Sequence, residues 1–113
     1  MRVVYVAGPF RGKDHYEIHK NICAAETLAL EVWKTENAAL CPHLNTAHFQ
    51  DTLPDHIWLD GDLEMLLRCD ALILTPDWER SKGAQAERQF AIEHNIPVFT
   101  NILDLQVWLS CQS

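Results

Sequence analysis

The sequence lacks the features that would place it in a membrane, on a nucleic acid or outside the cell. Its 113 residues include 9 lysines and arginines against 16 aspartates and glutamates, so the formal net charge is −7. Phosphate polyanions would be repelled, which argues against a general binder of nucleic-acid polymers or membrane surfaces. No apolar run approaches the roughly 20 residues that a membrane span requires. No basic segment precedes a hydrophobic one, so no signal peptide is visible.

Signatures of cofactor and metal sites are also missing. The chain has no Walker loop and no GxGxxG motif, so the ATP and dinucleotide classes lack their usual loop. No HExxH pattern supports a metal site, and the four cysteines lie far apart without a CxxC pair. We therefore expect no cofactor and no metal, and we interpret the cysteines as reduced thiols of a cytoplasmic protein.

What is present is the composition of one globular domain. Apolar residues make up 48% of the chain, which argues against disorder, and 113 residues suffice for a real core. No internal repeat, low-complexity tract or linker divides the sequence. We therefore expect a single domain over residues 1–113.

Apolar periodicity predicts strands and helices in alternation. Asp14 resembles the start of a capping box, and Pro54 suits the first turn of a helix. Strands are expected at residues 2–7, 39–42, 71–75 and 98–100, and helices at about 15–33, 54–67, 82–94 and 102–110. The expected inward-facing positions of the second helix are Leu59, Leu63, Leu66 and Leu67.

This alternation predicts an α/β protein with a three-layer, flavodoxin-like or Rossmann-like fold and a small parallel sheet. We expect the strand order 2-1-3-4. The winding then reverses between strands one and three, which creates a crevice at the carboxyl ends of these strands. The loops at residues 8–13 and 76–83 both open into that crevice.

Glu87 is the first candidate for a functional group. It shares one face of the third predicted helix with Ala84, Phe90 and Ala91. An acid on the apolar face of a helix is costly unless it is paired or used. Gly83 and Ala84 are expected to let this helix begin close to the sheet.

The loop after the first strand is the candidate substrate-binding loop. It consists of Gly8, Pro9, Phe10, Arg11 and Gly12. The glycines permit close approach of a ligand to the backbone, and Arg11 has the chemistry to hold a phosphate or carboxylate. A solvated loop cation is the alternative for Arg11. The hydroxyl of Tyr5 needs a partner, for which Glu87 is one candidate, and ordinary core packing is the alternative.

Three more polar residues have both a functional and a structural interpretation. Asp62 borders the apolar stripe of the second helix, but Asp60 borders its other margin, so position alone does not choose between them. Asp70, directly before the third strand, is a candidate binding residue or a partner of local backbone amides. Ser81 precedes the third helix, where it either helps to bind an anion or serves as an ordinary cap.

Histidine and tryptophan side chains are candidate ligand contacts. His43 and His48 share one loop, and His56 begins the next helix. We interpret His43 as a substrate contact because no metal-binding pattern surrounds it. Trp78 lies at the lip of the predicted crevice, where it either stacks on a planar base or covers an edge of the core.

The order of these motifs resembles the nucleoside 2-deoxyribosyltransferase superfamily over nearly the whole chain. Tyr5-x-x-Gly8-Pro9-Phe10 is similar to the opening motif of that superfamily. Asp62-Leu63-Glu64 and Cys69-Asp70-Ala71-Leu72 resemble its acidic helix and following strand, and Gly83-x-x-x-Glu87 resembles the segment with the nucleophilic glutamate. Each motif alone is weak, but their order and spacing together are fairly specific.

The resemblance implies cleavage of an N-glycosidic bond. Glu87 would attack the anomeric carbon, Asp62 would position the sugar or assist proton transfer to the base, and Tyr5 would orient Glu87. Six residues before the glutamate, the transferases commonly have aspartate, but this chain has Ser81, as do the related deoxynucleoside 5′-monophosphate N-hydrolases. Arg11-Gly12 also resembles the opening loop of those hydrolases. A nucleoside 5′-monophosphate is thus favoured as substrate and water as acceptor.

Two other functions stay open at this point: a base-exchanging transferase, and a nucleotide-sensing module without chemistry. The expected partner in each case is a small-molecule nucleoside or nucleotide. The resemblance also implies a homodimer or higher homo-oligomer. Trp33, Trp58 and Trp108 offer apolar contacts for it, although all three are equally compatible with a core position.

Overall fold

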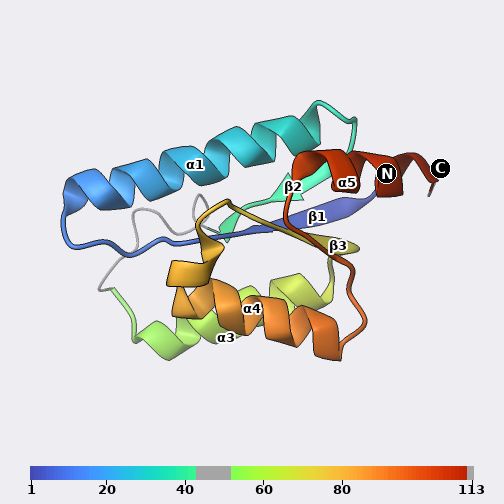
Figure 1. The fold of residues 1–113 in the computed structure, drawn as a ribbon. Coiled ribbons are helices and arrows are strands. Elements are labelled where there is room, and N and C mark those ends of the chain that lie inside the picture. The colour runs from blue at the N-terminus through green and yellow to red at the C-terminus, as the bar shows by residue number, and fades with distance from the viewer. Residues whose placement is uncertain (43–51, 112–113) are drawn as a thin grey trace.

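A four-stranded parallel sheet forms the centre of the protein in a computed structural model that describes residues 1–42 and 52–111 (Figure 1). The strands lie in the order β2-β1-β3-β4, which confirms the predicted topology. They are β1 (Val3–Ala7), β2 (Ala38–Leu40), β3 (Ala71–Leu74) and β4 (Val98–Phe99). The helices are α1 (His15–Trp33), α3 (Asp55–Leu67), α4 (Lys82–Glu93) and α5 (Ile102–Cys111), with a short 3-10 helix η1 (Trp78–Arg80).

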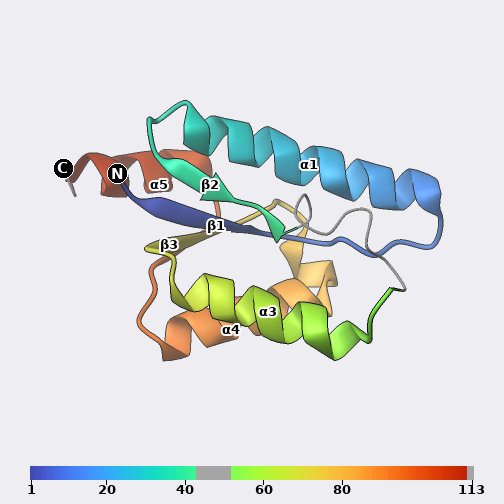
Figure 2. The same cartoon turned by 180° about the vertical axis from the view of Figure 1, so that it is seen from behind.

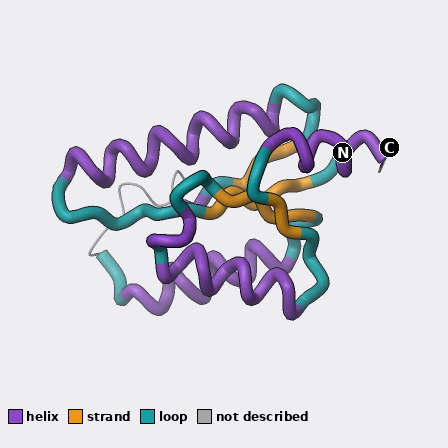
Figure 3. The backbone as a smooth tube through the Cα atoms, in the orientation of Figure 1, coloured by secondary structure: helices purple, strands orange, loops and turns teal. Residues whose placement is uncertain are grey.

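Helices cover both faces of the sheet, as the predicted three-layer α/β class requires. α1 and α5 lie on one face, and α3 and α4 lie on the other (Figure 2). The sheet is sandwiched between these helical layers in the tube view (Figure 3). Along β1, Val4 and Val6 pack in the core beneath α1 and α5, whereas Tyr5 and Ala7 face the core beneath α3 and α4. This alternation directs Tyr5 toward the helix that carries Glu87.

Helix α1 begins and packs as its sequence predicts. The side chain of Asp14 caps it by accepting a hydrogen bond from the backbone N–H of Glu17 at 2.9 Å. Ala25, Ala29 and Val32 are buried against the sheet. One further buried residue on this helix is polar, Asn21, which the apolar pattern did not predict.

The expected apolar stripe of α3 is wrong in part. Leu66 is fully buried and Leu63 is half-buried, but Leu59 and Leu67 are 55% and 46% exposed. Leu66 and Leu67 are consecutive, and side chains one position apart point in directions about 100° apart on a helix, so a narrow contact buries only one of them. Leu59 lies in the N-terminal half of α3, at the wall of a cavity described below.

The tryptophans fall into different environments. Trp108 packs on Phe99 with ring centroids 5.6 Å apart, and Trp33 is 52% exposed. Trp58 lines the cavity. Within the described residues, no helix has the length and apolar character to cross a membrane.

A close approach of two chain segments fixes the carboxyl ends of β1 and β3. Gly8, directly after β1, lies against Thr75, directly after β3. The backbone N–H of Thr75 donates to the carbonyl of Ala7 at 2.9 Å, and an ideal Cβ placed on Gly8 would lie 2.9 Å from the Cβ of Thr75. The strand ends therefore meet only because residue 8 has no side chain.

Gly8→Ala is expected to lower the free energy of unfolding by about 1–3 kcal/mol, because the new methyl group overpacks against Thr75. Gly61→Ala is the matched control, since a Cβ at this position of α3 meets no atom within 4 Å. In that helix interior the substitution is expected to stabilise by about 0.5–1 kcal/mol. Urea unfolding of both variants measures the two effects, and a Gly8→Ala protein as stable as the wild type would contradict the packing described.

Candidate active site

A cavity of about 980 Å³ lies at the carboxyl ends of the strands, where the two long loops meet. Its walls come from the loop after β1 (residues 8–12), the start of α1, residues 55–63 on α3 and residues 80–87 at the start of α4. Phe10, Trp58 and Leu59 supply large apolar surfaces to these walls. The predicted crevice is therefore present at the switch in winding, and it has both apolar and charged walls.

Glu87 lines this cavity and is held by Tyr5. The Tyr5 hydroxyl donates a hydrogen bond to Oε2 of Glu87. Burial raises the pKa of Glu87, the hydrogen bond from Tyr5 lowers it and the charge of Asp62 raises it, and the net result is a pKa of about 7. Tyr5 itself is fully buried, and burial together with the negative charge of Glu87 raises its pKa far above the ordinary value. Tyr5 therefore stays a proton donor in this contact.

Asp62 and not Asp60 faces the site. Asp62 is half-buried and lines the cavity, where burial raises its pKa to about 6. Asp60 is exposed. The structure thus separates two positions that their spacing in the sequence could not, and it brings two carboxyl groups with raised pKa values to one cavity.

All five residues of the candidate binding loop belong to the cavity wall: Gly8, Pro9, Phe10, Arg11 and Gly12. Arg11 forms an ion pair across the mouth with Asp55 at the start of α3, and both side chains are largely exposed. A Cβ on Gly12 would lie 2.7 Å from the Cβ of Glu17, so packing against α1 is sufficient reason for this glycine.

Ser81 both caps α4 and lines the cavity. Its Oγ accepts a hydrogen bond from the backbone N–H of Ala84 at 3.1 Å, which leaves its O–H group as a donor. Ala84 is fully buried, as expected. Gly83, a further candidate binding residue, also lines the cavity. A Cβ there would meet only Ser81 Oγ, at 3.8 Å, so the packing of the helix start does not require a glycine at this position.

Asp70, a predicted contact, is not brought to the cavity. Asp70 lies at the amino end of β3, at the opposite edge of the sheet, where it accepts a hydrogen bond from the N–H of Val3 at 2.8 Å and faces Arg2 at 3.6 Å. Its carboxylate thus serves the local backbone, the alternative interpretation above. His43 and His48 lie outside the described residues, and His56 is exposed. Over residues 1–42 and 52–111, no group of three potential ligands forms a metal site.

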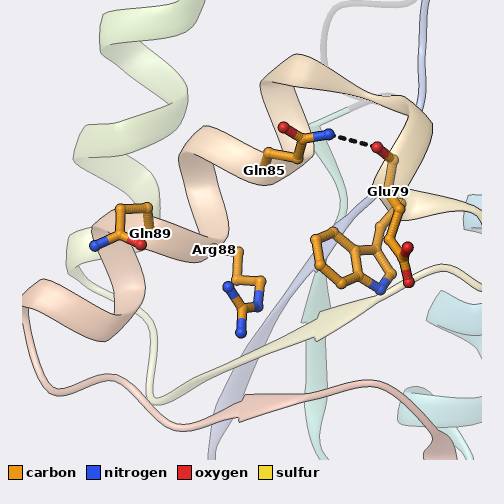
Figure 4. A pocket seen from close by; sticks show the side chains of 5 residues that line it. Glu79, Gln85, Arg88 and Gln89 are labelled. Atoms are coloured by element: carbon orange, nitrogen blue, oxygen red, sulfur yellow. Dashed lines mark hydrogen bonds between the residues drawn. The ribbon is translucent and has the colours of Figure 1, made fainter.

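Trp78 lines a separate pocket of about 540 Å³ on α4 and η1 (Figure 4). The guanidinium of Arg88 lies over its indole ring, 5.2 Å from the centroid. The amide of Gln85 donates to the backbone carbonyl of Glu79 in the same pocket (Figure 4). The indole face is therefore occupied by a protein cation and is not presented to the cavity that contains Glu87.

Sequence reasoning missed two residues that connect the loops of the site, Asn21 and Arg80. Arg80 lines the cavity and donates to the side-chain oxygen of Asn21 at 3.2 Å. The available signal was that Asn21 stands three residues after Ile18 and four before Ala25, on the apolar face of α1. A polar residue in such a stripe indicates a partner in the tertiary structure.

Fold and site together define a flavodoxin-like α/β protein with paired carboxyl groups in a cavity at the strand ends. The chain belongs to the family described as Domain of unknown function (DUF4406), which matches residues 2–100. No curated protein matches the sequence. Among solved structures, the chain is similar to a 2-deoxyribosyltransferase from the psychrotolerant bacterium Bacillus psychrosaccharolyticus, with 19% identity, a TM-score of 0.63 and coverage of 85% of this chain and 69% of that one. This likeness shows that the two proteins share a fold.

The raised pKa of Glu87 makes a prediction about stability and pH. The folded protein binds this proton more tightly (pKa about 7) than the unfolded chain, where a glutamate has its ordinary pKa of 4.5. The stabilisation is therefore complete below the ordinary pKa and is lost as pH rises through the folded one. On raising the pH from 5 to 8, the wild type should lose about 2–3 kcal/mol more stability than Glu87→Gln, which cannot ionise.

Urea unfolding at both pH values measures this difference. Glu93→Gln, an exposed change in the last turn of the same helix, is the matched control and should behave as the wild type does. Equal pH dependence in wild type and Glu87→Gln would show that Glu87 is not held in a desolvated site.

Proposed function

We propose that the protein is an N-glycosidase that cleaves the base–sugar bond of a ribo- or deoxyribonucleoside 5′-monophosphate, with Glu87 as nucleophile. The observation that carries this proposal is the carboxylate of Glu87 on the cavity wall, oriented by the buried hydroxyl of Tyr5. A desolvated, oriented carboxylate beside a second acid is the arrangement that retaining glycoside cleavage uses. The order of the sequence motifs and the fold shared with a 2-deoxyribosyltransferase support the same chemistry.

In the first step, an Oε atom of Glu87 attacks C1′ of the sugar. The C1′–N bond breaks, and its electron pair leaves with the base nitrogen, which takes a proton from Asp62. The product is a glycosyl ester of Glu87 with release of the free base. In the second step, water attacks C1′ and gives its proton to the Asp62 carboxylate, while the ester C1′–O bond breaks and Glu87 is regenerated.

The proposed steps require one proton on the pair formed by Asp62 and Glu87. Their pKa values are about 6 for Asp62 and about 7 for Glu87, so near neutral pH the pair is expected to hold one proton. The Tyr5 hydrogen bond stabilises the ionised form of Glu87. Because Glu87 has the higher pKa, this proton lies on Glu87 in the free protein. The proposed reaction therefore requires its transfer to Asp62 when substrate binds, which leaves Glu87 as the nucleophile.

The phosphate end of the substrate is assigned to the loop side of the cavity. Arg11, Arg80 and Lys82 bring positive charge to this rim, and the Ser81 hydroxyl remains a donor. The hydroxyl of a serine at this position can donate a hydrogen bond to a phosphate, whereas the negative charge of an aspartate would repel it. Phe10 and Trp58 supply the apolar surface on which a base can lie.

A base-exchanging transferase is the second candidate, because the chain shares the fold of a 2-deoxyribosyltransferase. Its first step would be identical. The ester would then be attacked by a nitrogen of a second base in place of water, so product would form only when an acceptor base is added.

The proposal predicts release of free base from one or more members of a panel of ribo- and deoxyribonucleoside 5′-monophosphates. Chromatography of the reaction mixtures measures this release. Glu87→Gln should lower kcat by at least about 1000-fold, because a neutral amide cannot replace the carboxylate as the nucleophile at C1′. Glu93→Gln is the control variant, and circular dichroism checks that each variant is folded.

Absence of base release across the panel, with and without acceptor bases, would contradict the enzymatic proposal. Saturable nucleotide binding that Glu87→Gln leaves unchanged would then indicate a sensing module.

The role of Tyr5 is tested separately. Tyr5→Phe keeps the buried ring but removes the hydrogen bond to Glu87, so the pKa of Glu87 should rise. The acidic limb of the kcat profile should move to higher pH, and kcat at neutral pH should fall by about 10-fold or more, with little change in KM. Rates measured from pH 5 to 9 give both quantities. An unmoved acidic limb would exclude an orienting role for Tyr5.

A further inference from the structure

The buried amide of Asn21 connects the two loops that form the cavity. Asn21 lies on the buried side of α1 and is only 4% exposed, although its side chain is polar. Its Nδ2 donates to the backbone carbonyls of Phe10 and Arg11, each at 3.2 Å. Its Oδ1 accepts from Nη2 of Arg80, also at 3.2 Å. One side chain thus joins the loop after β1 to the loop after β3.

Arg80 is held from more than one side. Its Nε and Nη2 donate to Oδ2 of Asp77 at 3.0 and 2.6 Å, and its Nη1 lies 3.8 Å from Oε1 of Glu17 on α1. Burial acts to raise the pKa of Asp77, but the hydrogen bonds from Arg80 and Thr75 outweigh it and lower the pKa below its ordinary value. Asp77 therefore stays ionised and keeps the guanidinium at the cavity rim in a fixed orientation.

The amide of Asn21 also fixes the orientation of two peptide groups in the loop after β1. The chain has no cis peptide bond within the described residues, and in a trans peptide the N–H points opposite to the C=O. Because the carbonyls of Phe10 and Arg11 point to Asn21, the N–H groups of Arg11 and Gly12 point away from it. Neither N–H has a hydrogen-bond partner in the part of the chain that the structure describes, and both residues line the cavity.

We propose that Asn21 is a positioning residue for the phosphate end of the substrate. By holding two carbonyl groups, it presents the N–H groups of Arg11 and Gly12 to a phosphate oxygen, and it sets the guanidinium of Arg80 at the same rim. Consecutive backbone N–H groups beside a guanidinium are a common way to bind a phosphomonoester. This inference rests on the proposed function and deepens it, because it locates the subsite that separates a nucleotide from a nucleoside.

A purely structural role explains less of what is seen. An apolar residue at this position would complete the stripe of α1 without the cost of burying an amide. Instead, the N–H donors of the amide bond the loop after β1 and its oxygen accepts from Arg80 in the loop after β3, so its hydrogen bonds join the two loops of the cavity.

Asn21→Asp tests the proposal with almost no change in shape. A carboxylate loses both donors and repels the two carbonyl oxygens, so the loop peptides should turn away. We expect KM for the best deoxynucleoside 5′-monophosphate to rise at least about 10-fold. We expect kcat to change by less than about 2-fold, and KM for the corresponding free nucleoside to stay the same, because neither depends on this subsite. Asn21→Ala should shift KM in the same direction without adding a charge.

The matched control is Asn37→Asp. Asn37 also bonds backbone on two sides, since it accepts from the N–H of Arg2 at 2.9 Å and donates to the carbonyl of Thr35 at 3.1 Å. It lies at the amino edge of the sheet, away from the cavity. Asn37→Asp should therefore lower stability while leaving KM for both substrates unchanged.

Calorimetric titration with deoxynucleoside 5′-monophosphates and free nucleosides separates this inference from the proposed reaction. A nucleotide-specific loss of affinity in Asn21→Asp, without base release by the wild type, would support the subsite and refute the hydrolase. Base release with a KM that Asn21→Asp does not alter would refute the subsite alone. Equal affinity of the wild type for nucleotide and nucleoside, or binding of neither, would also overturn the inference.

Discussion

The hydrogen bond between Tyr5 and Glu87 is the interaction on which the rest of the site depends. It joins the central strand β1 to helix α4, so the position of the carboxylate is set by the most buried part of the sheet. Burial opposes the charge of Glu87, whereas the tyrosine hydroxyl favours it. The balance places the pKa of Glu87 near neutrality, where a carboxylate is both available and poorly solvated. Such a group is suited to attack a carbon that develops positive charge.

The winding of the chain supplies the surroundings of this carboxylate. Strands β1 and β3 lie side by side, and each is followed by a loop at its carboxyl end. Gly8 and Thr75 hold the two strand ends in contact, and Asn21 joins the loops further out. The carboxyl groups of Glu87 and Asp62 thus line the part of the cavity between α3 and α4, whereas Arg11, Arg80 and Lys82 lie on or beside its loops. This separation of charge suits a substrate that carries an electron-poor sugar carbon and a phosphate at different ends.

Periodicity predicted the fold because most of the helices and strands bury one continuous face or run; α3 is an exception, since Leu66 is the one fully buried residue of its predicted stripe. The same logic selected Glu87 as a candidate, because its spacing placed an acid among apolar neighbours. It also selected Tyr5, because a tyrosine hydroxyl in a buried strand needs a partner, and the structure pairs it with Glu87. It failed for Asp70 because proximity to a strand does not reveal which end of the sheet a residue occupies; Asp70 precedes β3 and lies at the amino edge. It also failed for Trp78, whose ring is covered by Arg88, ten residues later on the neighbouring helix. The position of Asn21 on the apolar face of α1 indicated a tertiary partner, but the sequence could not identify its partners, which are two loop carbonyls and the side chain of Arg80.

A carbon-13 NMR titration of the Glu87 side-chain carboxyl in the wild type and in Tyr5→Phe tests the central claim most directly. The account predicts a pKa of about 7 in the wild type and a higher value once the hydroxyl is removed. A carboxyl that titrates at its ordinary value of 4.5, and is indifferent to the loss of the Tyr5 hydroxyl, would contradict it.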